Sequence, residues 1–204
     1  LEVDMSGSTL QYTDPQLTAG YKTVKVTAGT IAAASGATNA LDFTNAASSP
    51  TLELNAGTVA DTVVMSSGTV KLTGGGATYT LPAMSGSGNT LEVGGAAGIY
   101  ELPTTTSGGT TSYVVDAAFD EVKLTQGTLG SSPKILDMSN LTSPTLNYAG
   151  GLLGAASVAM TSGTVAVNTT TYPTLPTFST ETQNATAADP SLMNTLDLIK
   201  APAS

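Results

Sequence analysis

Residues 63–72 of the chain read VVMSSGTVKL. The stretch ends in an apolar, polar, apolar triplet, residues 70–72, which is typical of a short strand with one buried face. Before the triplet stand two serines, a glycine and a threonine. Gly68 can adopt a positive φ without steric cost, which indicates a tight corner, and the threonine–aliphatic pair after it restarts a strand. The stretch therefore predicts a strand, a corner and a second strand in immediate succession.

Both patterns recur along the chain. The apolar, other, apolar triplets are Val24-Lys25-Val26, Leu52-Glu53-Leu54, Val70-Lys71-Leu72, Leu91-Glu92-Val93, Val122-Lys123-Leu124 and Val165-Ala166-Val167. The corner pattern lies at residues 27–31, 55–59, 66–70, 125–129 and 161–165. Helical periodicity is nearly absent, and threonine, valine and glycine all disfavour helix. The chain is therefore predicted to be all-β.

Longer segments of the chain repeat as well. Residues 17–31 align without a gap to residues 115–129, with an aromatic residue, a lysine and the corner at the same places. Further matching pairs are residues 41–45 with 136–140, 49–52 with 143–146, 65–70 with 160–165 and 81–85 with 175–179. Self-similarity of this extent predicts a tandem duplication with units of about 95 residues. The first unit is predicted at residues 1–89, the second at 90–185, and a tail at 186–204.

The tail carries a strand that resembles the start of a third unit. Leu1-Glu2-Val3 opens the first unit, Leu91-Glu92-Val93 opens the second, and Leu196-Asp197-Leu198 has the same pattern. An unpaired edge strand is an open hydrogen-bonding template. We therefore expect the extra strand either to fold back on its own chain or to pair with another molecule.

Two architectures fit units of this length. In a parallel β-solenoid, strands joined by tight corners coil into stacked rungs, which suits the recurring corner, the small residues and the scarcity of aromatics. In a tandem of β-sandwiches each unit is a two-sheet domain of about 100 residues, which suits the unit length and the proline-bearing breaks near Pro82, Pro103 and Pro176. We predict the solenoid and keep the tandem sandwich as the alternative.

Residues 51–59 and 63–75 resemble the passenger regions of bacterial autotransporters and haemagglutinin-type adhesins. The resemblance lies in composition and covers most of the chain, although the unit is longer than is usual in those families. It implies a right-handed parallel β-helix that is displayed outside the cell. An extracellular or cell-surface location follows as an expectation from the resemblance.

The composition excludes several classes of function. The chain has 204 residues, a formal net charge of −9, and no Cys, His or Trp, and its basic residues are all lysines. Without His and Cys it cannot build a His/Cys zinc site, a thiolate nucleophile or a Ser-His-Asp triad. Basic residues number 6 against 15 acidic ones, a poor surface for phosphates, so we expect no nucleic-acid partner. No apolar run reaches the roughly 18 residues of a membrane span, so we expect no membrane insertion.

Carboxylates are the strongest catalytic groups that remain. Asp116, Asp120 and Glu121 form one local cluster, and Glu2 with Asp4 forms another. Two acids at a suitable separation can cleave a glycosidic bond, and oxygen ligands can bind calcium, but no calcium-loop motif occurs. Acids of this kind more often lie on solvated strand faces or corners. We therefore expect no catalytic residue, no metal and no cofactor, and predict that the protein is not an enzyme.

Tyrosines and sequons complete the candidates. Tyr79, Tyr100 and Tyr172 each stand shortly before Leu-Pro and could stack on a ligand, but a recurrent tyrosine at a strand end is more often part of the core. Asn-x-Ser/Thr sequons begin at Asn140, Asn168 and Asn184. Because a threonine-rich chain produces sequons by chance, they do not establish glycosylation.

We therefore expect an extracellular structural protein, either a subunit of a self-assembling surface filament or the stalk of an adhesin. Its main partner would be further copies of itself, with a surface glycan as a second candidate. The predicted subunit contact consists of apolar residues near the two ends, Leu1, Val3, Met5, Leu196, Leu198 and Ile199. The alternatives are a carbohydrate-binding or carbohydrate-cleaving β-helix, such as a piece of a phage tail fibre, and a capsid or decoration protein.

Overall fold

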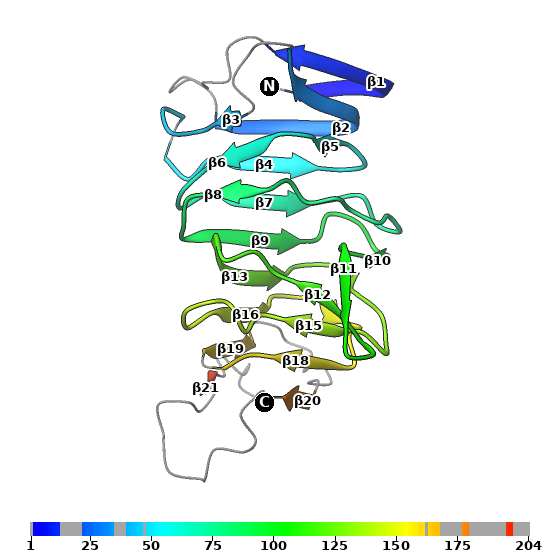
Figure 1. The fold of residues 1–204 in the computed structure, drawn as a ribbon, viewed down its shortest axis with the longest axis vertical. Coiled ribbons are helices and arrows are strands. Elements are labelled where there is room, and N and C mark those ends of the chain that lie inside the picture. The colour runs from blue at the N-terminus through cyan, green and yellow to red at the C-terminus, as the bar shows by residue number, and fades with distance from the viewer. Residues whose placement is uncertain are drawn as a thin grey trace, which may run out of the picture.

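A computed structural model of the chain describes residues 2–12, 22–34, 40–46, 48–161, 163–167, 177–179 and 195–197. These residues form strands and turns, and none of them is helical (Figure 1). The prediction of an all-β protein is confirmed.

The largest sheet has ten strands, and nine of them follow one another in chain order. These are β1 (Glu2–Tyr12), β2 (Thr23–Ala33), β4 (Thr51–Leu54), β7 (Thr69–Leu72), β9 (Asn89–Val93), β13 (Phe119–Leu124), β16 (Thr145–Tyr148), β19 (Thr164–Val167) and β21 (Thr195–Asp197). The tenth, β5 (Thr58–Val59), pairs with the end of β2. Figure 1 shows these strands stacked along the long axis of the molecule, with β1 near one end and β21 near the other.

Three smaller sheets lie between successive strands of the largest one in the chain. One consists of β3 (Ala40–Asp42), β6 (Thr62–Val64) and β8 (Met84–Ser85), and a second of β10 (Ile99–Tyr100), β14 (Thr128–Leu129) and β17 (Leu152–Leu153). The third has β11 (Thr104–Ser107), β12 (Thr110–Val114), β15 (Ile135–Asp137), β18 (Ser157–Ala159) and β20 (Thr177–Ser179). Neighbouring described strands are parallel, apart from the antiparallel pair β11–β12. Between each two successive strands of the main path from β2 to β21, the chain contributes at least one strand to a smaller sheet.

The core is built from rows of apolar side chains that the register aligns. Because side chains alternate between the faces of a strand, in-register parallel strands stack residues of one kind on each face. One buried row of the largest sheet consists of Val24, Leu52, Val70, Leu91, Val122, Leu146 and Val165. The next consists of Val26, Leu54, Leu72, Val93, Leu124, Tyr148 and Val167. The triplets that predicted half-buried strands are therefore strands, with both apolar members buried.

The corner pattern bends the chain at the predicted places, but a positive φ at its glycine is the cause in only some of the copies. Gly127, between β13 and β14, has a φ of 72°, and a Cβ there would lie 2.6 Å from the ring of Tyr100. At residues 66–70 the positive φ belongs to Ser67, at 54°, and glycine is favoured at position 68 because a Cβ there would lie 2.8 Å from the backbone oxygen of Pro50. At residues 27–31 the backbone turns at Gly29, whose φ is 79°, yet β2 continues through it to Ala33. That copy of the pattern bends one strand and does not separate two.

The largest sheet continues through the boundary expected between residues 89 and 90. Strand β9 spans this boundary and pairs with β7 on one side and β13 on the other. The buried Asn89 side chain adds three hydrogen bonds: its Oδ1 accepts from Gly68 N at 3.0 Å, and its Nδ2 donates to Met65 O at 2.8 Å and Ala118 O at 3.0 Å. Side-chain bonds therefore join this strand to the turns beside both of its neighbours.

Matching segments of the sequence repeat make matching contacts. Thr69 N donates to Pro50 O at 2.8 Å, and Thr164 N donates to Pro144 O at 2.8 Å. Both bonds fix the backbone where the chain re-enters the largest sheet. The segments at 65–70 and 160–165 thus occupy corresponding places, one in each half of the stack.

Candidate functional site

The two outer strands of the largest sheet are the first candidate for an interaction surface. Within the described residues, β1 has β2 as its one neighbour and β21 has β19. A strand has two hydrogen-bonding edges, and an edge without a partner can pair with another chain. Each end of the sheet therefore has one edge that no described strand occupies.

Half of the predicted subunit-contact residues lie in these two strands. Val3 and Met5 belong to β1, and Leu196 belongs to β21, where its register partner is Val165. Leu1, Leu198 and Ile199 lie outside the described residues. The extra strand therefore pairs with its own chain along one edge, which is the first of the two outcomes expected for it.

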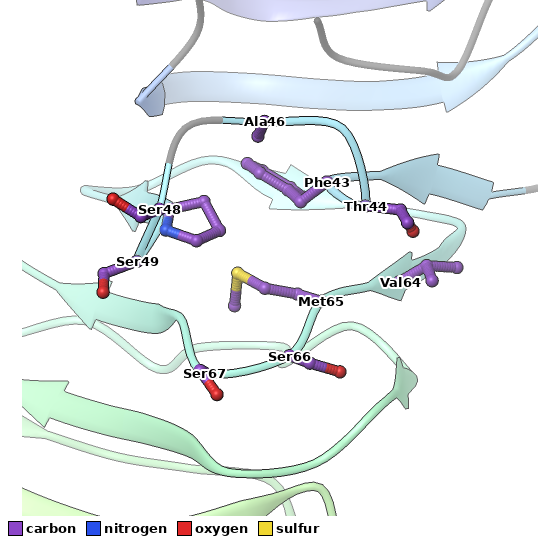
Figure 2. Close-up of a pocket in the computed structure, with 10 residues that line it drawn as sticks. Phe43, Thr44, Ala46, Ser48, Ser49, Val64, Met65, Ser66 and Ser67 are labelled. Carbon is purple, nitrogen blue, oxygen red and sulfur yellow. The ribbon is translucent and has the colours of Figure 1, made fainter. Parts of the chain in front are cut away.

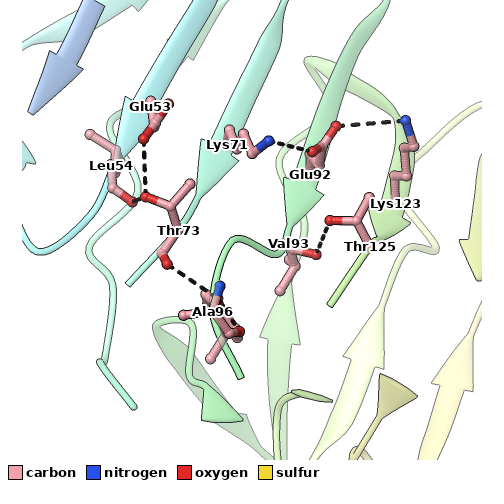
Figure 3. A network of polar contacts seen from close by, with 10 residues as sticks. Glu53, Leu54, Lys71, Thr73, Glu92, Val93, Ala96, Lys123 and Thr125 are labelled. Carbon is pink, nitrogen blue, oxygen red and sulfur yellow. Dashed lines mark hydrogen bonds and ion pairs between the residues drawn. The ribbon is translucent and has the colours of Figure 1, made fainter. Parts of the chain in front are cut away.

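A row of alternating charges crosses the largest sheet beside the two core rows. Its members, in register order, are Lys25, Glu53, Lys71, Glu92 and Lys123. The Nζ–Oε distance from Lys25 to Glu53 is 3.8 Å. Figure 3 shows the two ion pairs of Glu92, whose oxygens lie 2.9 Å from Lys71 Nζ and 3.6 Å from Lys123 Nζ. The same register leads to Glu2 at one end and, through Asn147 and Ala166, to Asp197 at the other.

The alternation has a simple physical role. Parallel strands in register place corresponding residues side by side, so identical charges in this row would repel one another. Opposite signs turn that repulsion into weak attraction, at about 0.2–1 kcal/mol for an exposed pair. The signal was present in the sequence, because the middle residues of the first five triplets alternate in sign from lysine to glutamate, but recognising it requires knowledge of which strands are neighbours.

Two of the acidic candidates, Asp116 and Glu121, are held in local structural hydrogen bonds, while the side chains of Glu2 and Asp4 lie outside the described part of the structure. Asp116 Oδ1 accepts a hydrogen bond from Ala118 N at 2.8 Å, and Glu121 Oε2 accepts one from Thr90 Oγ1 at 3.1 Å. Asp120, the third member of the cluster, is exposed. No group of three His, Cys, Asp or Glu residues in the described part of the chain could hold a metal ion. Asp116 and Glu121 therefore brace a turn and a strand face.

The two described tyrosine candidates belong to the core. Tyr79 and Tyr100 are buried, and their rings stack with centroids 5.9 Å apart. Tyr79 Oη lies 2.6 Å from both Asn55 O and Gly74 O, and it can donate to either. Burial raises the pKa of Tyr79 to about 12. The expectation of core tyrosines is confirmed for these two, and Tyr172 lies outside the described residues.

One polar cluster could not be predicted from any local sequence pattern. The Glu101 carboxylate accepts hydrogen bonds from Tyr113 Oη and, at 2.6 Å, from Lys134 Nζ, while Ser131 N donates to Tyr113 Oη at 3.1 Å. Lys134 Nζ also lies 4.9 Å from the centre of the Tyr113 ring. Burial opposes ionisation of Glu101, but the hydrogen bonds from Lys134, Tyr113 and Ser131 outweigh it and hold the pKa of the carboxyl below its ordinary value. The cluster ties together three segments that are distant in sequence, and each polar group already has a partner.

Comparisons with protein-family models, curated proteins and solved structures give no match for this chain. Among the described residues, no helix is long and apolar enough to cross a membrane. A function for this chain is therefore inferred from its own sequence and from the surfaces that the structure describes.

Proposed function

We propose that this chain is an extracellular structural protein, a subunit of a self-assembling surface filament or part of an adhesin stalk. The observation that carries the proposal is the order of the largest sheet, in which parallel strands follow one another from β1 to β21. A second copy can extend such a sheet at either end without changing strand direction. The contact between β21 of one copy and β1 of the next is heterologous and does not close on itself, so it generates a filament.

We infer further that the strands form a right-handed β-solenoid built from two tandem units. The regular return of the chain to the largest sheet supports a coil. Parallel pairing supports it over tandem sandwiches, because β-sandwich domains consist of antiparallel sheets. Connections between parallel strands of one sheet are almost always right-handed, which supports the handedness.

The register supports the same subunit contact. Leu196 is in register with Val165 of the first buried row, and Val3 is in register with Val26 of the second. A neighbouring copy that kept this register would extend both core rows across the junction. Main-chain hydrogen bonds would supply affinity, and the alternating apolar residues near the ends would supply the packing. Leu1, Met5, Leu198 and Ile199 complete the proposed contact.

Engineered disulfides test the end-to-end contact directly, since the chain has no cysteine of its own. Glu2 and Asp197 belong to one register row, so continued stacking places Glu2 of one copy beside Asp197 of the next, and the double substitution also removes the repulsion between these two acids. Adjacent strands lie about 4.8 Å apart, which is within the Cα separation that a disulfide spans. We expect the double variant Glu2→Cys/Asp197→Cys to form a ladder of covalent multimers on oxidation, and each single variant to stop at dimers.

Negative-stain microscopy of the unmodified chain provides the second test. We expect linear particles at high protein concentration, and their loss on deletion of residues 190–204 or on Leu196→Pro, which removes a backbone donor from β21. Thr106→Ala, an exposed change on β11, is the matched control. Only monomers at high concentration, together with the absence of a disulfide ladder, would contradict the proposal.

A carbohydrate-binding β-helix is the second candidate, and one observation favours it. A cavity of ≈ 340 Å³ on the five-stranded sheet is lined by hydroxyl groups, one carboxylate and two apolar side chains. These residues are Thr105, Ser107, Thr110, Ser112, Ile135, Asp137 and Ala159. Binding on a glycan array that Thr110→Ala or Asp137→Ala abolishes would support this candidate, and an array without hits would count against it.

A further inference from the structure

Two loops in the two halves of the chain share their backbone structure, and one side chain distinguishes them. In residues 42–46, Ala46 N donates to Phe43 O at 3.0 Å. In residues 137–141, Leu141 N donates to Met138 O at 3.1 Å. Ala46 and Leu141 therefore occupy corresponding positions, but the first loop has a methyl group where the second has an isobutyl group.

The larger side chain is buried and the smaller one borders a cavity. Leu141 has 5% of its surface exposed and belongs to the hydrophobic core. Beside Ala46, a cavity of ≈ 390 Å³ opens over Phe43 and Met65, which are buried (Figure 2). The rest of its described wall is neutral, includes serine hydroxyls such as those of Ser48 and Ser66, and contains no charged residue. The first half of the chain thus has a cavity at the position where the second half has the buried side chain of Leu141.

The second half indicates the chemistry that fits this cavity. A leucine side chain at the corresponding position is buried in the core, three residues after Met138 and with the same backbone bond. Burying a leucine side chain is favourable, and a wall without charged groups imposes no cost for removing a charge from water. A leucine from another molecule therefore suits the cavity by size and by polarity.

The chain presents such a leucine on its own surface. Among the described residues, Leu152 in β17 is the most exposed large hydrophobic side chain, at 50%, followed by Ile99 at 49% and Val114 at 37%. Gly150 and Gly151 precede Leu152, so its neighbours on that side have no side chains that could cover it. The backbone around Leu152 can therefore approach another surface closely, and the Leu152 side chain would be the first group to touch it.

We propose that the cavity over Phe43 and Met65 receives Leu152 of a second copy of this chain. The proposal rests on the proposed self-assembly and adds a sideways contact to the end-to-end contact. The cavity and Leu152 are different surfaces, so the contact is heterologous and repeats from copy to copy without closing. It joins neighbouring stacks by burial of an apolar side chain, and it involves no ion pair.

Two variants block the contact from opposite sides. Ala46→Leu fills the cavity with the residue found in the second loop, and Leu152→Ser removes the inserted group. Val114→Ser is the matched control, because Val114 is also an exposed hydrophobic side chain but lies on β12, in a different sheet from Leu152. In sedimentation velocity over a concentration series, we expect each blocking variant to weaken association by about tenfold or more, and the control to leave it unchanged.

Stability measurements separate a blocked contact from a damaged fold. Ala46→Leu should raise the thermal midpoint of the monomer, and Leu152→Ser should lower it only slightly, because half of the Leu152 side chain is already exposed. A fall of the midpoint with Ala46→Leu means that the two loops do not correspond and overturns the proposal. Unchanged association in both blocking variants also overturns it.

The two proposals can fail separately. If the Glu2→Cys/Asp197→Cys ladder forms but association does not respond to Ala46→Leu, the sideways contact is wrong and the end-to-end contact stands. If association responds to both blocking variants but no ladder forms, the sideways contact stands and the end-to-end contact is wrong. High salt should strengthen the sideways association, since no ion pair is screened and sulfate strengthens apolar burial.

Discussion

The Glu92 carboxylate and the Lys71 ammonium face each other across neighbouring parallel strands, with 2.9 Å between Oε1 and Nζ. The second oxygen of Glu92 lies 3.6 Å from Lys123 Nζ on the opposite side. Glu92 therefore separates two lysines that occupy the same row of the largest sheet. The charge at position 92 therefore decides whether neighbouring side chains in the middle of the row attract or repel one another.

Reversing that sign should destabilise the sheet. Glu92→Lys would place three ammonium groups in succession, and we expect the free energy of unfolding to fall by about 1–2 kcal/mol, against about 0.5–1 kcal/mol for Glu92→Gln. Urea unfolding at low and high ionic strength measures both. The loss in Glu92→Lys should shrink in 1 M salt, where the screening length is about 3 Å. Asp120→Lys, the same charge change at an exposed site, is the control, and an equal loss there would contradict the role of the row.

Asn89 should be among the most sensitive polar positions of the described chain. Asn89→Ala removes all three side-chain bonds, including the acceptor of Gly68 N, in a fully buried place. A buried group without a partner costs about 1–3 kcal/mol, so we expect a total loss of roughly 2–5 kcal/mol. Thermal unfolding measures the change, with the exposed Asn140→Ala as the control. Equal midpoints for the two variants would show that the Asn89 bonds contribute nothing.

Two buried tyrosines should respond to loss of the hydroxyl in opposite directions. Tyr79→Phe removes a hydroxyl bonded to main-chain carbonyls and should destabilise by about 1–2 kcal/mol. The Tyr148 hydroxyl is buried without a hydrogen-bond partner among the described residues, so Tyr148→Phe should be neutral or should stabilise by up to roughly 1 kcal/mol. Chemical denaturation of the pair provides the comparison. A larger loss in Tyr148→Phe than in Tyr79→Phe would refute this assignment.

The same tyrosines should make the fold sensitive to alkali. Burial raises the pKa of Tyr79 from 10.0 to about 12 and raises that of Tyr148 as well. The folded state therefore keeps protons that the unfolded state has released, so stability is unaffected below pH 10 and falls as the pH rises from 10 towards 12. The urea midpoint, followed across this range, measures the fall. Tyr79→Phe/Tyr148→Phe should flatten it, and an equally steep fall in that variant would contradict the explanation.

The Glu101 cluster should have the opposite pH dependence. The hydrogen bonds that outweigh burial hold the pKa of Glu101 below 4.5, so its contribution is complete above pH 4.5 and is lost as the pH falls through the lower, folded-state value. Glu101→Gln should lower the thermal midpoint at neutral pH and weaken the acid dependence. Midpoints of variant and wild type that stay equally far apart down to the acid limit would show that the carboxylate charge is not the cause.

Much of the local structure was predictable from the sequence. Strands β2, β4, β7, β9, β13 and β19 contain the predicted triplets, because alternation of apolar residues is a local property of an extended chain. The corner at Gly127 was predictable for the same reason, since a positive φ is a property of one residue and its neighbours. The need for glycine at position 68 was not predictable, because it comes from the backbone oxygen of Pro50, which only the fold brings close to Gly68.

For the candidate surfaces too, the sequence indicated the positions and the fold decided the pairing. The sequence marked Val3, Met5 and Leu196 as apolar positions in strand-like segments, but it left open whether the last strand pairs within the chain. Pairing of β21 with β19 was decided by contacts between residues about 30 positions apart. Closing so long a loop costs entropy, which hydrogen bonding to a sheet that has already formed can offset. The ion pairs of Glu92 and the bonds that gather around Glu101 depend on the same long-range pairing.

The sequence by itself therefore determined the all-β class, the strand segments and the poverty of reactive groups, because each follows from residue types and their local spacing. The tertiary structure alone decided which strands are neighbours, which charges meet, and where a side chain is missing from the core. The cavity beside Ala46 is an example, since alanine is unremarkable in the sequence and becomes informative once Leu141 is seen buried at the corresponding place. Packing is a relation between distant residues, and only the folded chain brings them together.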